Sequence, residues 1–146
     1  MNSVNRFGLT LTGLVLAASP LGLHAQPIAA AAVSKVLGIG GVVYKVDTKR
    51  RPSQPHTDHE YNTAGGDTVL FLVTAPGDQY AGWKSGMSDF EAVAGLGTEA
   101  VFDKTLGMLC ARNGGKAACL TQNIVYFVAK PKPSVAQLRE LLQQAL

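Results

Sequence analysis

The sequence has little charge and only two cysteines. Of its 146 residues, 16% are Asp, Glu, Lys or Arg, whereas 16 residues are Gly. This composition suits a compact, turn-rich domain better than a disordered chain. One basic cluster is present, Lys49-Arg50-Arg51, but no regular basic stripe with aromatic partners follows it. Nucleic-acid binding needs such a stripe, so we expect no nucleic-acid partner.

Motifs for phosphate and for catalytic zinc are also missing. Gly38-x-Gly40-Gly41 lacks the strand-then-helix context of a phosphate-binding loop. The segment His56-Thr57-Asp58-His59-Glu60 is not the helical zinc-protease motif, which has His at i and i+4 with Glu directly after the first. Its histidines remain candidate loop ligands for zinc or copper, although solvated loop histidines are more common. We expect no cofactor.

Nucleophilic catalysis has only a compositional signal. Ser53, His56 and Asp58 are the residue types of a catalytic triad. Their closeness in sequence is no evidence of triad geometry, which is defined by positions in space. A small hydrolase is therefore an alternative of low rank, and we expect no enzyme.

Residues 1–25 have the pattern of an export signal. Arg6 precedes an apolar run, Phe7 to Leu23, which ends at a small residue, Ala25. A basic start, an apolar middle and a small final residue are what the secretion machinery recognises. Pro and Gly near the end of the run leave fewer than the roughly 20 apolar residues that a membrane anchor needs. We expect cleavage after Ala25 and one periplasmic or secreted domain, residues 26–146, without a membrane span.

Cys110 and Cys119 are expected to form a structural disulfide across a hairpin, because cysteine pairs in exported proteins usually bond to each other. A turn at Gly114-Gly115 places the two cysteines opposite each other in a non-hydrogen-bonded pair, with Cα atoms about 4.5 Å apart. A turn at Asn113-Gly114 would instead place Cys110 opposite Ala117 and strain the bridge. The cysteines therefore favour Gly114-Gly115 or a longer loop.

The pattern of apolar residues predicts an α+β fold, in which a mostly antiparallel sheet of about five strands is packed by helices and contains the disulfide-stapled hairpin. The strongest strand is 68–74, which is expected to be central and covered on both faces. Residues 47–66 form a long polar stretch, either a functional loop or an extended hairpin arm. If it is a loop, protease should cut first within Lys49 to Arg51.

The other expected elements are helices at 28–37 and within 75–87, strands at 40–46, 89–94 and 99–103, and hairpin arms at 106–112 and 116–129, with the apolar run 124–128 in the second arm. The chain is expected to end in a helix that begins with a capping box of Ser134 and Gln137. The apolar stripe of this helix consists of Leu138, Leu141, Leu142 and Ala145.

An aromatic pair is the other candidate binding feature. Asp78 is the expected N-cap of the second helix, and Tyr80, Trp83 and Met87 then fall on one helical face. Tyr80 and Trp83 could form a platform for a ligand, but core packing of the same stripe is the more common outcome. The candidate binding residues are thus His56, His59, Tyr80 and Trp83.

The segment Val93-Ala94-Gly95-Leu96-Gly97-Thr98-Glu99-Ala100 resembles part of a group of small exported bacterial domains, many of them lipoproteins of unknown function. Their hallmark is Gly-Leu-Gly-acidic-x-Ala, then a short strand hairpin and a closing helix, and residues 68–146 follow that order. Thr98 stands where an acid is usual, and no lipid-attachment Cys is present. Gly95 and Gly97 can also supply positive φ at a tight corner. The resemblance implies a PsbP-like architecture and a binding or accessory role, with no catalytic residues to carry over.

These observations favour an exported, non-catalytic module that binds another envelope or secreted protein, or a small apolar ligand. A metal-binding protein that uses His56 and His59 is the alternative.

Overall fold

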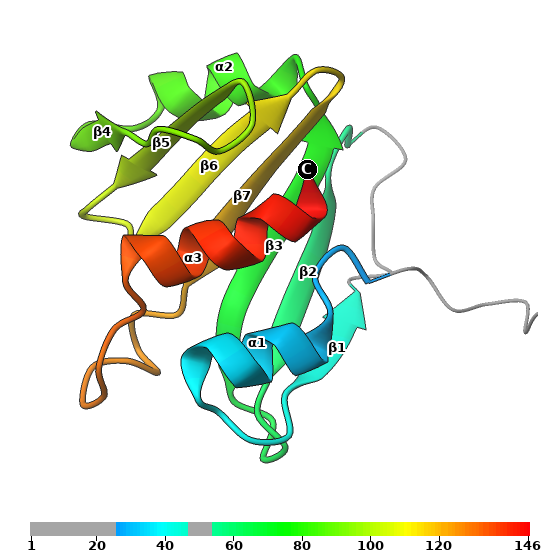
Figure 1. Cartoon of the computed structure of the whole chain (residues 1–146), viewed down its shortest axis with the longest axis vertical. Coiled ribbons are helices and arrows are strands. Elements are labelled where there is room, and N and C mark those ends of the chain that lie inside the picture. The colour runs from blue at the N-terminus through cyan, green and yellow to red at the C-terminus, as the bar shows by residue number, and fades with distance from the viewer. Residues whose placement is uncertain (1–25, 47–53) are drawn as a thin grey trace, which may run out of the picture.

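The computed structural model describes residues 26–46 and 54–146. Within these ranges the chain forms one antiparallel sheet of seven strands in the order β1-β2-β3-β7-β6-β5-β4, with three α-helices (Figure 1). The elements are α1 (Ala30–Leu37), β1 (Val43–Val46), β2 (Thr57–Asn62), β3 (Thr68–Pro76), α2 (Gln79–Ser85), β4 (Phe90–Ala92), β5 (Glu99–Asp103), β6 (Met108–Asn113), β7 (Lys116–Gln122), α3 (Val135–Leu142) and a short 3-10 helix (Gln143–Ala145). The expected α+β class is confirmed.

The main core lies between the sheet and the helices α1 and α3, which both cover the face that we call the inner face (Figure 1). Leu72, Leu109 and Leu120 from the strands and the buried leucines of α3 belong to this core, and α3 packs against β6 and β7. α3 begins as predicted: Oγ of Ser134 accepts from the Gln137 N–H at 3.2 Å, and Oε1 of Gln137 accepts from the Ser134 N–H at 2.9 Å. Its three leucines, Leu138, Leu141 and Leu142, are fully buried.

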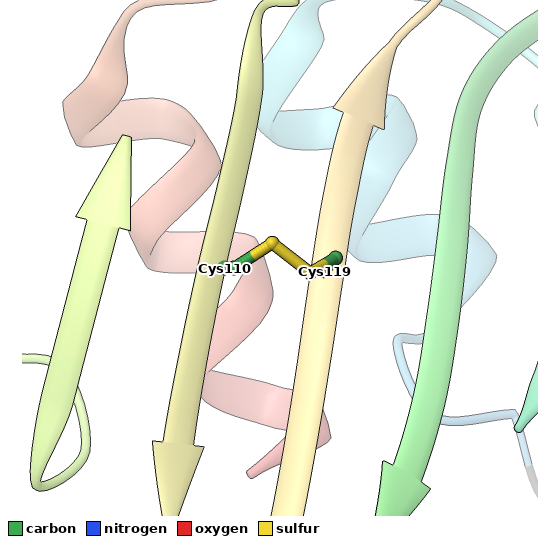
Figure 2. The surroundings of a disulfide bond; sticks show 2 residues. All are labelled: Cys110 and Cys119. Atoms are coloured by element: carbon green, nitrogen blue, oxygen red, sulfur yellow. A yellow bond between two sulfur atoms is a disulfide. The ribbon is translucent and has the colours of Figure 1, made fainter. Parts of the chain in front are cut away.

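The β6–β7 hairpin confirms the disulfide and its register. Asn113 pairs with Lys116 across the Gly114–Gly115 turn, and Cys110 pairs with Cys119. The two cysteines are bonded, with their Cα atoms 4.0 Å apart (Figure 2). The bond lies on the outer face of the sheet, opposite α1 and α3, and α2 packs over it.

The expected glycine corner precedes β5. Gly95 and Gly97 have φ of 72° and 59°, which is the left-handed region that favours glycine. A Cβ at Gly97 would overlap the carbonyl oxygen of Arg112, which accepts from the Thr98 N–H at 2.9 Å. Leu96, between the glycines, is buried in the main core. The corner thus brings a leucine inward while the backbone passes close to β6.

The number of strands corrects the sequence-based expectation of about five. β2 lies inside the polar stretch 47–66, so the alternative of a hairpin arm holds for residues 57–62. The strand buries His59 and Tyr61 on one side and carries polar residues on the other. Because five of its six residues are polar or charged, the sequence shows no apolar–polar alternation that would predict a strand. Residues 47–53, with the basic cluster and its expected protease site, lie outside the described residues, as do residues 1–25.

Two expectations about strand ends and cover are wrong. β7 ends at Gln122, and residues 124–128 form turns instead of continuing the strand. Gln122 pairs with Leu70, so only Thr68 and Val69 at the start of β3 remain as further partners. The Asn123 N–H donates to Val69 O at 2.9 Å, and the strand pairing stops there. β3 is central, but Phe71 remains 40% exposed, so the strand is not covered on both faces. No helix within the described residues is long and apolar enough to cross a membrane.

Candidate functional site

A second, smaller core lies on the outer face, where α2 covers the disulfide. Tyr80 is 1% exposed and packs with Met87 against Cys110 and Cys119. Tyr80 is therefore a core residue and not a free platform. Asp78 stands at the N-cap position, but its side chain makes no capping hydrogen bond.

Trp83 lies at the margin of this core and is half-buried. It borders a hollow of about 290 Å³ between α2 and the strands, which we call the Trp83 hollow. The residues that line it are Val73, Gly82, Trp83, Gly86, Met87, Met108 and Cys119. They come from α2 and its C-terminal end and from strands β3, β6 and β7.

The lining of the Trp83 hollow is almost entirely apolar. Met87 and Met108 are the only methionines in the chain besides Met1, and Trp83 is its only tryptophan. Methionine is unbranched and polarizable, so it adapts to differently shaped apolar partners. Phe71, two residues before Val73 on the same face of β3, extends the apolar surface beyond the hollow. This arrangement suits an apolar group that has few polar atoms.

A charged cluster lies on the other flank of α2. Glu99 accepts from Lys84 Nζ at 2.6 Å, and Nη2 of Arg112 lies 3.2 Å from its other oxygen. The hydrogen bond from Lys84, together with the charge of Arg112, lowers the pKa of the Glu99 carboxyl. A hollow of about 480 Å³ opens here, bordered also by Tyr80 and Phe90. Because the cations already share one carboxylate, the cluster is largely satisfied within itself.

The hydroxyl of Tyr80 is buried beside this cluster, and no hydrogen-bond partner for it is found among the described residues. Burial, together with the negative charge of Glu99, raises the pKa of Tyr80 to about 12. The phenol therefore stays neutral in the ordinary pH range. It cannot serve as a base, and its role in the fold is packing.

His59 is a satisfied core histidine on the inner face. It is 5% exposed, with Nδ1 at 2.9 Å from the Tyr44 hydroxyl and Nε2 at 2.9 Å from Thr74 Oγ1. Burial lowers the pKa of its imidazole, although the nearby Asp58 charge opposes this. Both ring nitrogens are engaged, so the ring offers no free lone pair to a metal.

His56 does not join His59 in a common site. Its Nε2 lies 3.7 Å from Asp58, whose side chain points to the opposite face of β2 from that of His59. Within residues 26–46 and 54–146 no group of three potential metal ligands occurs. Of the triad types, His56 and Asp58 lie together, with the His56 Nε2 atom 3.7 Å from the Asp58 carboxylate, and Ser53 lies outside the described residues.

Of the four residues proposed as binding residues, Trp83 lines the Trp83 hollow and Tyr80 borders the hollow beside the charged cluster, whereas the two histidines line neither. Sequence reasoning missed Val73, Met108 and Cys119, which reach the hollow only through strand pairing. One signal could have pointed to two of the lining residues, because the chain after Met1 has only two methionines and both border Trp83. Comparisons of the chain with protein-family models, with curated proteins and with solved structures gave no significant match. The geometry beside α2 is thus the basis for proposing a function.

Proposed function

We propose that the protein is an exported, non-catalytic binding or accessory module that holds a small apolar group in the Trp83 hollow. The observation that carries this proposal is the joining of Trp83, Met87 and Met108 around one apolar concavity on the outer face. Ligand sites are typically concave, mostly apolar and few per protein. The resemblance of residues 93–100 to small exported domains agrees with an accessory role.

The size of the hollow limits the ligand class. Its volume of about 290 Å³ lies just below the roughly 300–1,000 Å³ of sites for drug-sized ligands. It therefore suits a short acyl or single-ring compound, or one apolar side chain of an envelope or secreted partner. The exposed ring of Phe71 would add contact area next to such a side chain.

Export is supported by the disulfide and by the pattern of residues 1–25. The bond between Cys110 and Cys119 is buried under α2, and disulfides of this kind form in oxidising compartments such as the periplasm or the extracellular space. We expect protein recovered from the envelope or the medium to begin at Gln26. An intact mass that retains Met1 would contradict the predicted signal cleavage.

Trp83 itself provides the test of binding, because all tryptophan emission comes from this site. We expect titration with decanoate, or with 1-anilinonaphthalene-8-sulfonate as an apolar probe, to shift or quench the Trp83 emission in a saturable way. Gly82→Leu should abolish this response, because Gly82 lines the hollow and a Cβ there has no neighbour within 4 Å. Gly82→Ala is the matched control: it fits the same open space and should still bind.

Two results would overturn the proposal. One is an unchanged Trp83 spectrum with both probes at concentrations that saturate ordinary acyl-binding proteins. The other is equal binding by the Leu and Ala variants, which would place the probe elsewhere on the surface.

A further inference from the structure

The segment between β7 and α3 presents aliphatic side chains to solvent. Ile124, Val125 and Val128 are 54%, 76% and 83% exposed. Single exposed apolar residues are ordinary, but a cluster within one turn marks a contact surface. Figure 1 shows this loop projecting from the end of β7 beyond the packed part of the molecule. We call these three residues the apolar tip.

The apolar tip is held in a fixed shape. Asn123 Nδ2 donates to Thr68 O at 2.8 Å, and its Oδ1 accepts from the Val125 N–H at 3.1 Å. Phe127 is buried in the main core, and Tyr126 packs against its ring edge-to-face with centroids 4.9 Å apart. The exposure of the aliphatic groups is thus built into the loop. A preorganised surface loses little conformational entropy on binding.

The charge beside the apolar tip is positive. Nζ of Lys130 lies 3.8 Å from the centre of the Tyr126 ring, and Lys132 follows two residues later. Residues 123–133 contain no Asp or Glu. Asp67, on the β2–β3 turn, is the acidic residue that borders the hollow behind the loop. The β5–β6 turn reaches the same end of the sheet, since Gly107 O accepts from the Gln122 N–H, and it carries the exposed Leu106.

We propose that the apolar tip docks on the surface of a bilayer that contains anionic phospholipid. The tip is aliphatic and exposed, Tyr126 lies in the same loop with Lys130 Nζ over its ring, and Lys132 follows two residues later. Aliphatic side chains beside a tyrosine and lysines match the residue types found at the membrane interface, where acyl chains give way to headgroups. The lysines would add attraction to anionic lipid, and three aliphatic side chains alone give only weak, reversible binding. The tip shares no residue with the Trp83 hollow, so this inference does not depend on the proposed function.

Vesicle flotation with the intact protein tests the proposal. We expect binding to vesicles of phosphatidylcholine mixed with phosphatidylglycerol, and much weaker binding to phosphatidylcholine alone. Val125→Ser/Val128→Ser should weaken binding by at least about tenfold, because both side chains lose their apolar burial. Lys130→Gln/Lys132→Gln should weaken it about fivefold for each lysine, the factor that corresponds to one basic residue near an anionic surface.

Matched charge removal elsewhere is the control. Lys45→Gln/Lys116→Gln removes the same charge from exposed positions on β1 and β7 and should leave binding nearly unchanged. If this control weakens binding as much as the Lys130 and Lys132 variant, net charge explains the attraction and the proposal fails. The proposal also fails if the unaltered protein floats with neither kind of vesicle. It fails as well if the Val125→Ser/Val128→Ser variant floats as well as the unaltered protein does.

Discussion

Tyr61→Phe is the substitution for which the structure gives the sharpest stability prediction. Tyr61 on β2 and Ile28, just before α1, are both fully buried. The Tyr61 hydroxyl donates to Ile28 O at 2.8 Å and accepts from the Ile28 N–H at 3.1 Å. The substitution removes one oxygen and leaves both polar groups of the Ile28 backbone buried without that partner. Each such group costs about 1 to 3 kcal/mol, so we expect a loss of about 2 to 6 kcal/mol for the two groups together. In a domain of somewhat more than 100 residues this lowers Tm by roughly 8 to 24 °C.

Urea unfolding of the oxidised protein, followed by Trp83 fluorescence and far-UV circular dichroism, measures this loss. The midpoint should move while the m value stays constant, because the unfolded surface is nearly the same. Tyr126→Phe is the control, since it removes the same atom from a half-buried ring and should cost less than about 0.5 kcal/mol. If the two variants have the same urea midpoint, the segment around Ile28 is not stabilised by its hydrogen bonds to the Tyr61 hydroxyl, and this prediction is wrong.

Three further predictions concern the corner, the disulfide and the buried histidine. Gly97→Ala should cost roughly 1 to 3 kcal/mol or more, because it adds left-handed strain and an overlap with the Arg112 carbonyl oxygen. Gly65→Ala, whose Cβ would only reach Thr63 Oγ1 at 3.6 Å, should be nearly neutral in the same urea assay. Cys110→Ser should lower stability by about 2 to 3 kcal/mol, as expected for opening a loop of about ten residues. In the unaltered protein, alkylation without reduction followed by mass measurement should find no free thiol. Burial lowers the pKa of folded His59, so the unfolded chain takes up its proton first, and stability present above about pH 6.5 is lost as the pH falls below it. His59→Gln should flatten this dependence and His56→Gln should not, whereas equal slopes in the two variants would refute the role given to His59.

Local sequence signals predicted the parts of the fold that neighbouring residues determine. The capping box at Ser134, the turn between Cys110 and Cys119 and the corner at Gly97 each depend on a few adjacent positions. In each case one geometry satisfies the local hydrogen bonds or places two side chains opposite each other. Such signals remain valid whatever the rest of the chain does.

Features that depend on distant partners were predicted only in part, since a hairpin arm was one of two alternatives for residues 47–66 and the end of β7 was placed too late. β2 is a strand of mostly polar letters, and its buried His59 is satisfied by Tyr44 and Thr74, each 15 residues away. Conversely, the apolar run 124–128 has strand composition but no neighbouring strand long enough to pair with it. Pairing and not composition decided both cases, and pairing cannot be seen from one segment alone.

The candidate site was predicted only as far as one helix face extends. The spacing of Tyr80, Trp83 and Met87 predicted which face of α2 packs on the sheet. In the structure Tyr80 is a core residue, whereas Trp83 lines the hollow. Val73 and Met108 come from different strands, and their approach to Trp83 requires the sheet order β3-β7-β6. The lining was therefore out of reach without the topology.

The two glycines that weaken the helical pattern of α2 also explain why the hollow exists. Gly82, inside α2, lowers helix propensity by about 1 kcal/mol relative to Ala, Gly86 is the C-cap residue, and both border the Trp83 hollow. Side chains at these positions would project beside Trp83, where a Cβ at Gly82 meets no atom within 4 Å. The short helix that results can still stay in place, because Tyr80 and Met87 hold it on a small core in which a disulfide ties β6 to β7. On the inner face α1 and α3 cover the main core. On the outer face only the short helix α2 covers the smaller core, which the disulfide between β6 and β7 stabilises. A departure from good local helix sequence is expected at a functional position, and here it coincides with the one concavity that contains the tryptophan.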